Sequence, residues 1–123
     1  MRIITDHKLN GLNEAIEIYA RDEPGQGGAS SDYLIVPNVT PGCAINPVTI
    51  KFQTGPIKEA GVNGTSQEAL LAVVIDRLRS FQAGPFACRD NAVALTKLEE
   101  ALMWLQKRTR DRMARGVEGT YQK

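Results

Sequence analysis

The sequence predicts an α+β fold, in which an N-terminal antiparallel β-sheet is followed by a C-terminal antiparallel two-helix hairpin. Short runs typical of half-buried strands fill the chain up to about residue 64. Two stretches with helical periodicity follow, and Gly84 and Pro85 lie between them. We therefore expect residues 1–64 to form a sheet layer and residues 65–123 a helical hairpin, which together make one domain.

The first part contains three segments with strand patterns, which we expect to pair as an antiparallel meander. Residues 16–20 alternate between apolar and polar, residues 33–36 form a short apolar run, and residues 48–53 alternate again. Residues 57–59 are expected to return as a short partner strand. The glycine-rich residues 22–31 form a loop, and composition favours a simple hairpin connection over a ligand-binding loop because its acids would repel phosphate.

The first helix begins with a capping box, in which Thr65 is the N-cap and Glu68 follows three residues later. Its apolar side chains share one face of the helix, and they are Leu71, Val74, Ile75 and Leu78. We expect this helix to end near residues 81–84.

The second helix is expected to span about residues 87–114, which corresponds to a length of about 40 Å. Leucines repeat along it at spacings of three, four and three, and they are Leu95, Leu98, Leu102 and Leu105. Gly116 is the expected helix stop. Because the first helix is shorter, the overhang must contact either the sheet or a second copy of the chain.

The composition is ordinary for a globular protein, with 42% hydrophobic residues, 24% charged residues and a net charge of +1. No apolar run approaches about twenty residues, so we expect a cytosolic protein. Cys43 and Cys88 have no metal-binding spacing, and we expect both thiols to be buried. His7 has no identifiable acid or nucleophile partner, so we expect no catalysis, metal or cofactor.

Positive charge gathers at the end of the second helix. Three arginines at i, i+4 and i+7 share a face there, and they are Arg108, Arg112 and Arg115. Guanidinium groups on one face can hold phosphate in a bidentate manner, but cations also complement the dipole at a helix C-terminus. The residues alone leave both interpretations open.

Polar and aromatic residues surround the Gly-Pro elbow between the helices. Asn91 lies in line with the leucines, so its amide either binds a ligand edge or buttresses the elbow through backbone hydrogen bonds. Phe81 and Phe86 flank the elbow and either stack on a base or anchor the hairpin. Trp104 lies off the leucine stripe, and we expect it to pack on the sheet or on a neighbouring subunit.

Several stretches together resemble the phage Thoeris anti-defence proteins, and the resemblance covers most of residues 14–120. The hairpin part of the resemblance is carried by residues 81–91, 94–105, 108–112 and 115–120. The sheet part is carried by residues 22–29 and 55–64. The hairpin motif is highly specific, and finding it with the sheet motif extends the resemblance along the chain.

The resemblance implies a phage protein that acts without catalysis in the cytoplasm of the infected bacterial host. Such a protein sequesters the cyclic ADP-ribose isomer that a bacterial TIR-domain defence enzyme makes, so that the effector is never activated. Some members also bind cyclic oligonucleotides, either di- or trinucleotides. A homodimer is expected, and some members form hexamers.

The resemblance also implies a pocket lined by the hairpin and the glycine loop. The expected contacts from the hairpin are Phe81, Phe86, Arg89, Asn91, Arg108 and Arg112. One phenylalanine would stack on a base, the asparagine would bind a polar edge, and one of the last two arginines would bind the pyrophosphate. The expected contacts from the loop are Gly27, Gly28 and Ala29, which reverses the preference that composition indicates.

A protein of a different class remains the alternative. A small nucleic-acid-binding protein would lay its basic helix end on a phosphate backbone and bind with a steep salt dependence. A structural phage protein would use the hairpin only as a seam between copies.

Overall fold

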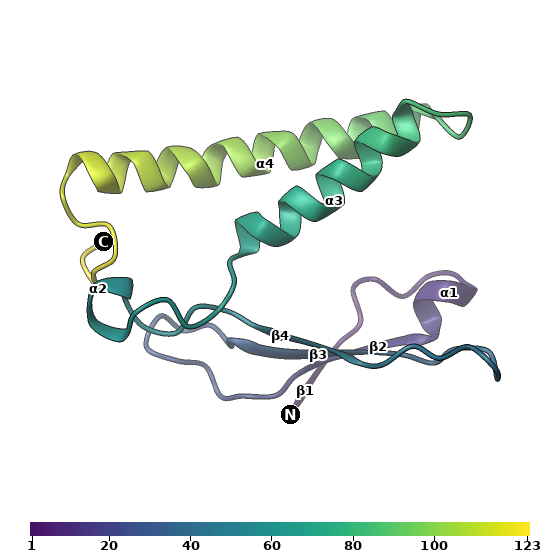
Figure 1. Ribbon diagram of the computed structural model, residues 1–123, viewed down its shortest axis with the longest axis horizontal. Helices are drawn as coiled ribbons and strands as arrows, with labels where there is room; N and C mark the ends of the chain where they lie inside the picture. Colours follow the sequence, from purple (N-terminus) through teal and green to yellow (C-terminus); the bar gives the residue numbers. More distant parts are fainter. The chain divides into compact units, whose positions relative to one another are not determined.

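The computed structural model describes residues 1–123 and contains a four-stranded antiparallel sheet followed by helices, which confirms the predicted α+β fold (Figure 1). Its contacts divide the chain into two compact units. The sheet unit consists of Met1–Thr54 and Val62–Thr65, and the helical unit consists of Gly55–Gly61 and Ser66–Lys123. None of the helices is long and apolar enough to cross a membrane.

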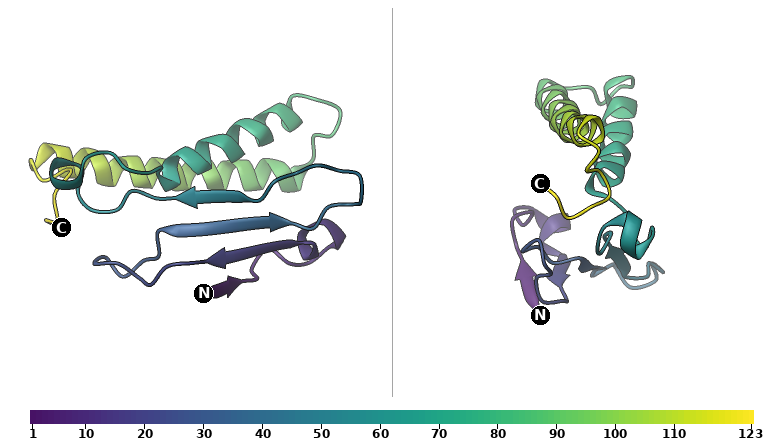
Figure 2. Two further views of the ribbon diagram at one scale, coloured as in Figure 1. Left: turned by 60° about the horizontal axis from the view of Figure 1, so that its bottom comes forward. Right: turned by 90° about the vertical axis from the view of Figure 1, so that its left-hand side faces the viewer.

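The sheet has the strand order β1-β2-β3-β4, and each neighbouring pair is antiparallel. Its strands are β1 (Arg2–Ile4), β2 (Ile16–Ala20), β3 (Asp32–Pro37) and β4 (Val48–Lys51), which lie side by side in Figure 2. Ile4 lies opposite Ile18, Ile18 opposite Ile35, and Ile35 opposite Val48. This apolar row across all four strands is the kind of cross-strand pairing that stabilises a sheet.

Two short elements at the N-terminus were not indicated by the sequence pattern. β1 has only three residues, which is too short to display an alternation. The one-turn helix α1 (Gly11–Glu14) begins at Asn10, whose side chain accepts a hydrogen bond from the Asn13 N–H at 3.1 Å. Both elements therefore depend on local caps and pairing partners.

The predicted capping box at residues 65–68 is wrong by one residue. The Thr65 N–H donates to the Lys51 carbonyl at 2.8 Å, so Thr65 extends the sheet and is not the helix cap. Ser66 is the N-cap instead, and its Oγ accepts from the Ala69 N–H at 3.1 Å. Glu68 is then too close to the cap to complete a capping box.

Residues 57–59 do not form the predicted return strand. They belong to α2 (Ile57–Ala60), a one-turn helix that Pro56 precedes and that Gly61 ends with a φ of 72°. A proline before a first turn loses no helical hydrogen bond, and Lys, Glu and Ala are good helix formers. These local preferences prevail over the apolar start that suggested a strand.

The helical hairpin is formed by α3 (Gln67–Gln82) and α4 (Arg89–Ala114), and α4 runs back along α3 (Figure 1). Ile75 of α3 is buried with 2% of its surface exposed. The predicted leucine stripe of α4 is half-buried along its whole length. Arg79 and Glu99 join the helices at 2.6 Å, but both are exposed, so this ion pair contributes only about 0.2–1 kcal/mol.

α4 stops just before Gly116, the predicted helix stop, which has a φ of 73°. The Val117 N–H donates to the Arg112 carbonyl at 3.0 Å, and the Gly116 N–H donates to the Met113 carbonyl at 3.1 Å, which together make a Schellman motif. α4 extends past α3, and the chain that follows its last turn folds back on it. Part of the overhang is therefore covered by the chain's own end.

The prediction that both cysteines are buried is wrong, because Cys43 and Cys88 are both exposed. Cys88 is the N-cap of α4, and its Sγ accepts from the Asn91 N–H at 3.5 Å. Cys43 lies in a turn that its N–H closes onto the Thr40 carbonyl at 3.0 Å. Each thiol therefore lies in a segment that connects regular elements, where no apolar side chains cover it.

Candidate ligand-binding site

The elbow between α3 and α4 presents aromatic, guanidinium and amide groups to solvent. Phe86 is 74% exposed and Phe81 is 36% exposed. Arg89 is exposed, Asn91 is half-buried, and neither side chain makes a hydrogen bond or ion pair within the chain. Four of the predicted contact residues thus lie at or next to the elbow, and the polar groups of Arg89 and Asn91 are available to a ligand.

Gln82, which the sequence pattern did not indicate, holds the elbow in shape. Its Nε2 donates to the Cys88 carbonyl at 3.0 Å, and its Oε1 accepts from the Cys88 N–H at 3.1 Å. This reciprocal pair is the buttress that one interpretation assigned to Asn91. A glutamine at the last position of a helix before a Gly-Pro turn is the only signal that could have identified it.

Phe81 lies on a groove of about 530 Å³ along α3, which is lined by Val73, Asp76, Arg77, Ser80 and Phe81. The guanidinium carbon of Arg77 is 5.0 Å from the centre of the Phe81 ring, a cation–π distance. One face of this ring is therefore already occupied. Of the two phenylalanines, Phe86 offers the more accessible surface for stacking.

The second half of α4 carries a basic groove of about 460 Å³, which is lined by Trp104, Lys107, Arg108, Asp111, Arg112, Arg115 and Lys123. Lys107 is paired with Asp111 at 2.7 Å, whereas Arg108 makes no hydrogen bond or ion pair within the chain. Trp104 is 57% exposed, so contact with a neighbouring subunit stays a prediction. Arg108 is thus a free cation beside an exposed indole.

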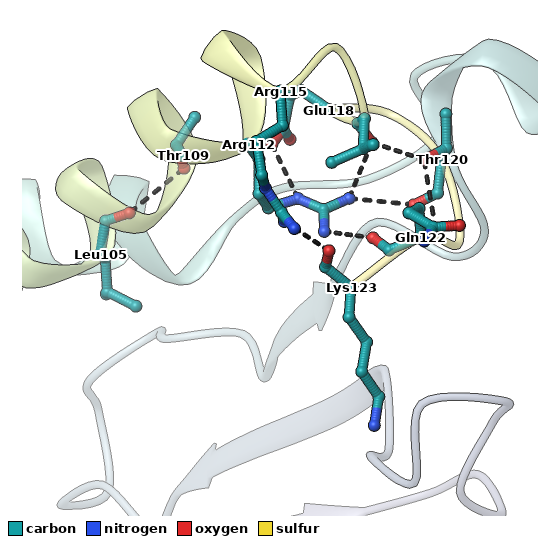
Figure 3. A network of polar contacts seen from close by, with 9 residues as sticks. Leu105, Thr109, Arg112, Arg115, Glu118, Thr120, Gln122 and Lys123 are labelled. Atoms are coloured by element: carbon teal, nitrogen blue, oxygen red, sulfur yellow. Dashed lines mark hydrogen bonds and ion pairs between the residues drawn. The ribbon is translucent and has the colours of Figure 1, made fainter.

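Arg112 has the opposite environment, because only 7% of it is exposed. Figure 3 shows the polar groups around its guanidinium. Its Nε donates to the Glu118 carboxylate at 3.0 Å, and Nη1 donates to the Gln122 carbonyl. Its Nη2 donates to the Val117 carbonyl at 2.9 Å and to the Thr120 carbonyl at 3.1 Å. One of the two guanidiniums expected to bind pyrophosphate is therefore already surrounded by acceptors of its own chain.

The glycine loop of the sheet unit is closed at its base by Asp22. This carboxylate accepts from the Ser31 N–H at 2.9 Å and from the Asp32 N–H at 3.1 Å. The hydrogen bond from Ser31 lowers the pKa of Asp22. The predicted contacts at the tip are exposed, and they are Gly27, Gly28 and Ala29.

The predicted contacts on α4 fall at opposite ends of the helix. Asn91 and Arg108 are about 26 Å apart along its axis, given the rise of about 1.5 Å per residue. That separation exceeds the reach of one small nucleotide ligand within a single chain. No group of three or more His, Cys, Asp or Glu side chains is placed to hold a metal ion.

Known proteins are similar to this chain over the hairpin and the segment before it. The family model described as "Acb2/Tad1, hairpin domain" matches residues 44–110, which include the elbow and Arg108 and end before Arg112. The protein "Thoeris anti-defense 1" of Bacillus phage SBSphiJ7 is 60% identical over 75 residues. The aligned region covers 61% of this chain and 53% of that protein, so the chain spans about half the length of this relative.

Proposed function

The chain belongs to the Acb2/Tad1 hairpin-domain family, and from that membership we propose that it is a phage anti-defence protein that sequesters a cyclic ADP-ribose isomer. The observation that carries the proposal is its 60% identity over 75 residues to a Bacillus phage protein named for Thoeris anti-defence. Cyclic oligonucleotides are a second ligand class with the same recognition groups, a base and a phosphate. The proposed action is binding without turnover in the infected host.

The groups at the elbow suit such a ligand. The exposed ring of Phe86 offers a stacking face for a base, and the Asn91 amide supplies both a donor and an acceptor for its edge. Arg89 and Arg108 carry free guanidiniums, which bind phosphate in a bidentate manner. A sequestering protein needs affinity and slow release, and preorganised contacts of this kind supply both.

Two copies of α4 in an antiparallel arrangement would bring the elbow of one copy next to the basic end of the other. The face of α4 opposite the leucine stripe is self-complementary in that arrangement. When Val93 faces Trp104 of the second copy, Lys97 faces its Glu100, and all four side chains are exposed in the single chain. The same register places Asp90 opposite Lys107 of the second copy.

The same register also sets Arg89 opposite Arg108 of the second copy. Two guanidiniums that approach each other repel unless an anion lies between them. A pyrophosphate held between them satisfies both, so the pairing that buries Trp104 also forms a phosphate site. By symmetry the dimer has two such sites, each made of Arg89 at the elbow of one copy and Arg108 of the other.

Calorimetry with a panel of ligands tests the proposal. The panel consists of cyclic ADP-ribose isomers, cyclic di- and trinucleotides and a short DNA duplex, and the bound ligand is recovered after heat denaturation of the protein. We expect tight binding of a cyclic ADP-ribose isomer and its recovery intact. Binding to the duplex alone would favour the nucleic-acid-binding alternative, binding to nothing would favour the structural one, and a degraded ligand would show catalysis.

A further inference from the structure

The segment that follows α4, residues 116–123, has no part in the proposed pocket, yet one buried side chain organises it. We infer that Arg112 is a positioning residue that holds this segment on α4 as a latch (Figure 3). The latch in turn orients Arg115 beside Arg108 to complete a groove for a small polyanion such as a diphosphate. The inference rests on the proposed function in so far as Arg108 belongs to both sites.

The hydrogen bonds of Arg112 exclude it as a free phosphate ligand. A guanidinium has five N–H donors, and here it makes four hydrogen bonds, to one carboxylate and three backbone carbonyls. Its side chain is only 8% exposed. A phosphate would have to displace acceptors that the chain itself provides, and a guanidinium left without them would be a buried unpaired charge.

The latch is anchored at a second place, on α2. The Lys58 N–H donates to the Gly119 carbonyl at 3.2 Å. Gly119 has a φ of 80°, and a Cβ at this position would lie 2.8 Å from Cγ1 of Ile57. The close approach and the left-handed backbone both require glycine. The segment is therefore fixed between α2 and the last turns of α4.

The latch acts on the basic groove through Arg115. The Nη2 of Arg115 donates to the Lys123 carbonyl, and both residues line the groove that contains Arg108 and Trp104. The other two cations of α4 there are neutralised, because Lys107 pairs with Asp111 and Arg112 pairs with an acid of the latch. Arg108 and Arg115 are left without acidic partners. They lie on one face of the helix about two turns apart, with Arg112 between them.

Two roles for Arg112 make opposite predictions for Glu118→Gln in the full-length chain. If Arg112 positions the latch, loss of the carboxylate loosens residues 117–122, frees Arg115 from its orientation and weakens anion binding. If Arg112 contacts the anion, the same substitution frees its guanidinium and leaves binding unchanged or makes it tighter. Arg112→Lys separates the roles again, because lysine keeps the charge but cannot hold four acceptors arranged around a planar fork.

The test is calorimetry with inorganic pyrophosphate, combined with amide hydrogen exchange of residues 117–122. We expect Glu118→Gln and Arg112→Lys to weaken pyrophosphate binding about tenfold, the effect of losing one well-oriented charged hydrogen bond, and to lose exchange protection in the latch. Arg115→Gln should weaken binding by a similar factor and keep the protection. Arg110→Gln, an exposed arginine of α4 without an acidic partner, is the matched charge control and should change neither.

Unchanged or tighter pyrophosphate binding by Glu118→Gln would overturn the inference, and so would a wild-type chain that does not bind pyrophosphate. Equal losses for Arg115→Gln and Arg110→Gln would reduce the effect to net charge and also overturn it. Because neither readout uses a defence signal, a failure of the sequestration proposal would leave the result on the latch standing.

Discussion

The two ends of α4 carry the same kinds of residue in opposite states. At the N-terminal end, Arg89 and Asn91 are unpaired within the chain. At the C-terminal end, Arg112 is buried and makes four hydrogen bonds to the segment that follows. Spacing along a helix tells which face a side chain occupies, but its availability depends on the acceptors that the chain brings to that end.

The path of the chain explains the difference. The carbonyls that accept from Arg112 belong to Val117, Thr120 and Gln122, in the segment that returns over the end of α4 and not in the helix itself. Arginine is only a donor, so it is satisfied where a returning segment supplies acceptors, and no segment supplies them at the elbow. At the elbow, Gln82 supplies the acceptor that the Cys88 N–H requires, and Arg89 stays free.

The largest effect on stability should follow from Arg112→Ala. The substitution leaves the Glu118 carboxylate and three carbonyls without their donor, so we expect the free energy of unfolding to fall by about 2–3 kcal/mol. Glu118 is 37% exposed, which keeps the loss below that of a fully buried pair. Urea denaturation followed by circular dichroism measures it.

Arg89→Ala is the matched control at the other end of the helix, and it should change the free energy of unfolding by less than about 0.5 kcal/mol. Equal losses for the two variants would show that the ends of α4 do not differ in the way described.

Glycine substitutions near the two ends of α4 should differ in their effect on the free energy of unfolding, but by a smaller amount. Gly119→Ala forces a side chain into left-handed backbone against Ile57, and we expect a loss of about 1–2 kcal/mol. Gly84 at the elbow has no positive φ, and a Cβ there would meet nothing closer than 3.6 Å, so Gly84→Ala should be nearly neutral. Thermal unfolding of the two variants side by side measures this difference. A Gly119→Ala variant as stable as the wild type would contradict it.

Gln82→Ala should have the smallest effect on stability that is still measurable. It removes two hydrogen bonds to Cys88 at an exposed site, so we expect a loss of about 0.5–1 kcal/mol. Asn91→Ala, whose amide has no partner in the chain, should lose less than that and should weaken binding of the signal instead. If Asn91→Ala proved the more destabilising of the two, the buttress would have been assigned to the wrong residue.

The regular elements could be predicted from the sequence because their signals are local. Three of the four strands, both long helices and the stop at Gly116 follow from alternation, helical periodicity and a glycine placed after the last periodic residue. The exceptions have local causes as well. α2 forms because Pro56 and good helix formers prevail over one apolar residue, and the helix cap moves because Thr65 is taken up by the sheet.

The candidate site was less predictable, because availability depends on partners distant in the chain or absent from it. The i, i+4, i+7 arginines do share a face, but nothing in that spacing shows that residues 117–122 return to surround the middle one. The elbow was singled out by its residue types, but neither its exposure nor the hydrogen bonds of Gln82 were indicated. Sequence patterns therefore identified the region, and the tertiary hydrogen bonds separate free groups from occupied ones.

The most direct test of the proposed shared pocket is complementation between two inactive variants. Arg89→Ala damages the elbow side of the shared site and Arg108→Ala its basic end, and the two residues are about 28 Å apart in one chain. We expect neither variant alone to bind the cyclic ADP-ribose isomer in calorimetry. After the two are unfolded together and refolded, the mixed dimers should regain one intact pocket each, or about one quarter of all sites for random pairing. A mixture that binds no ligand, while wild-type protein treated in the same way does, would contradict a pocket built from the elbow of one copy and the basic end of another.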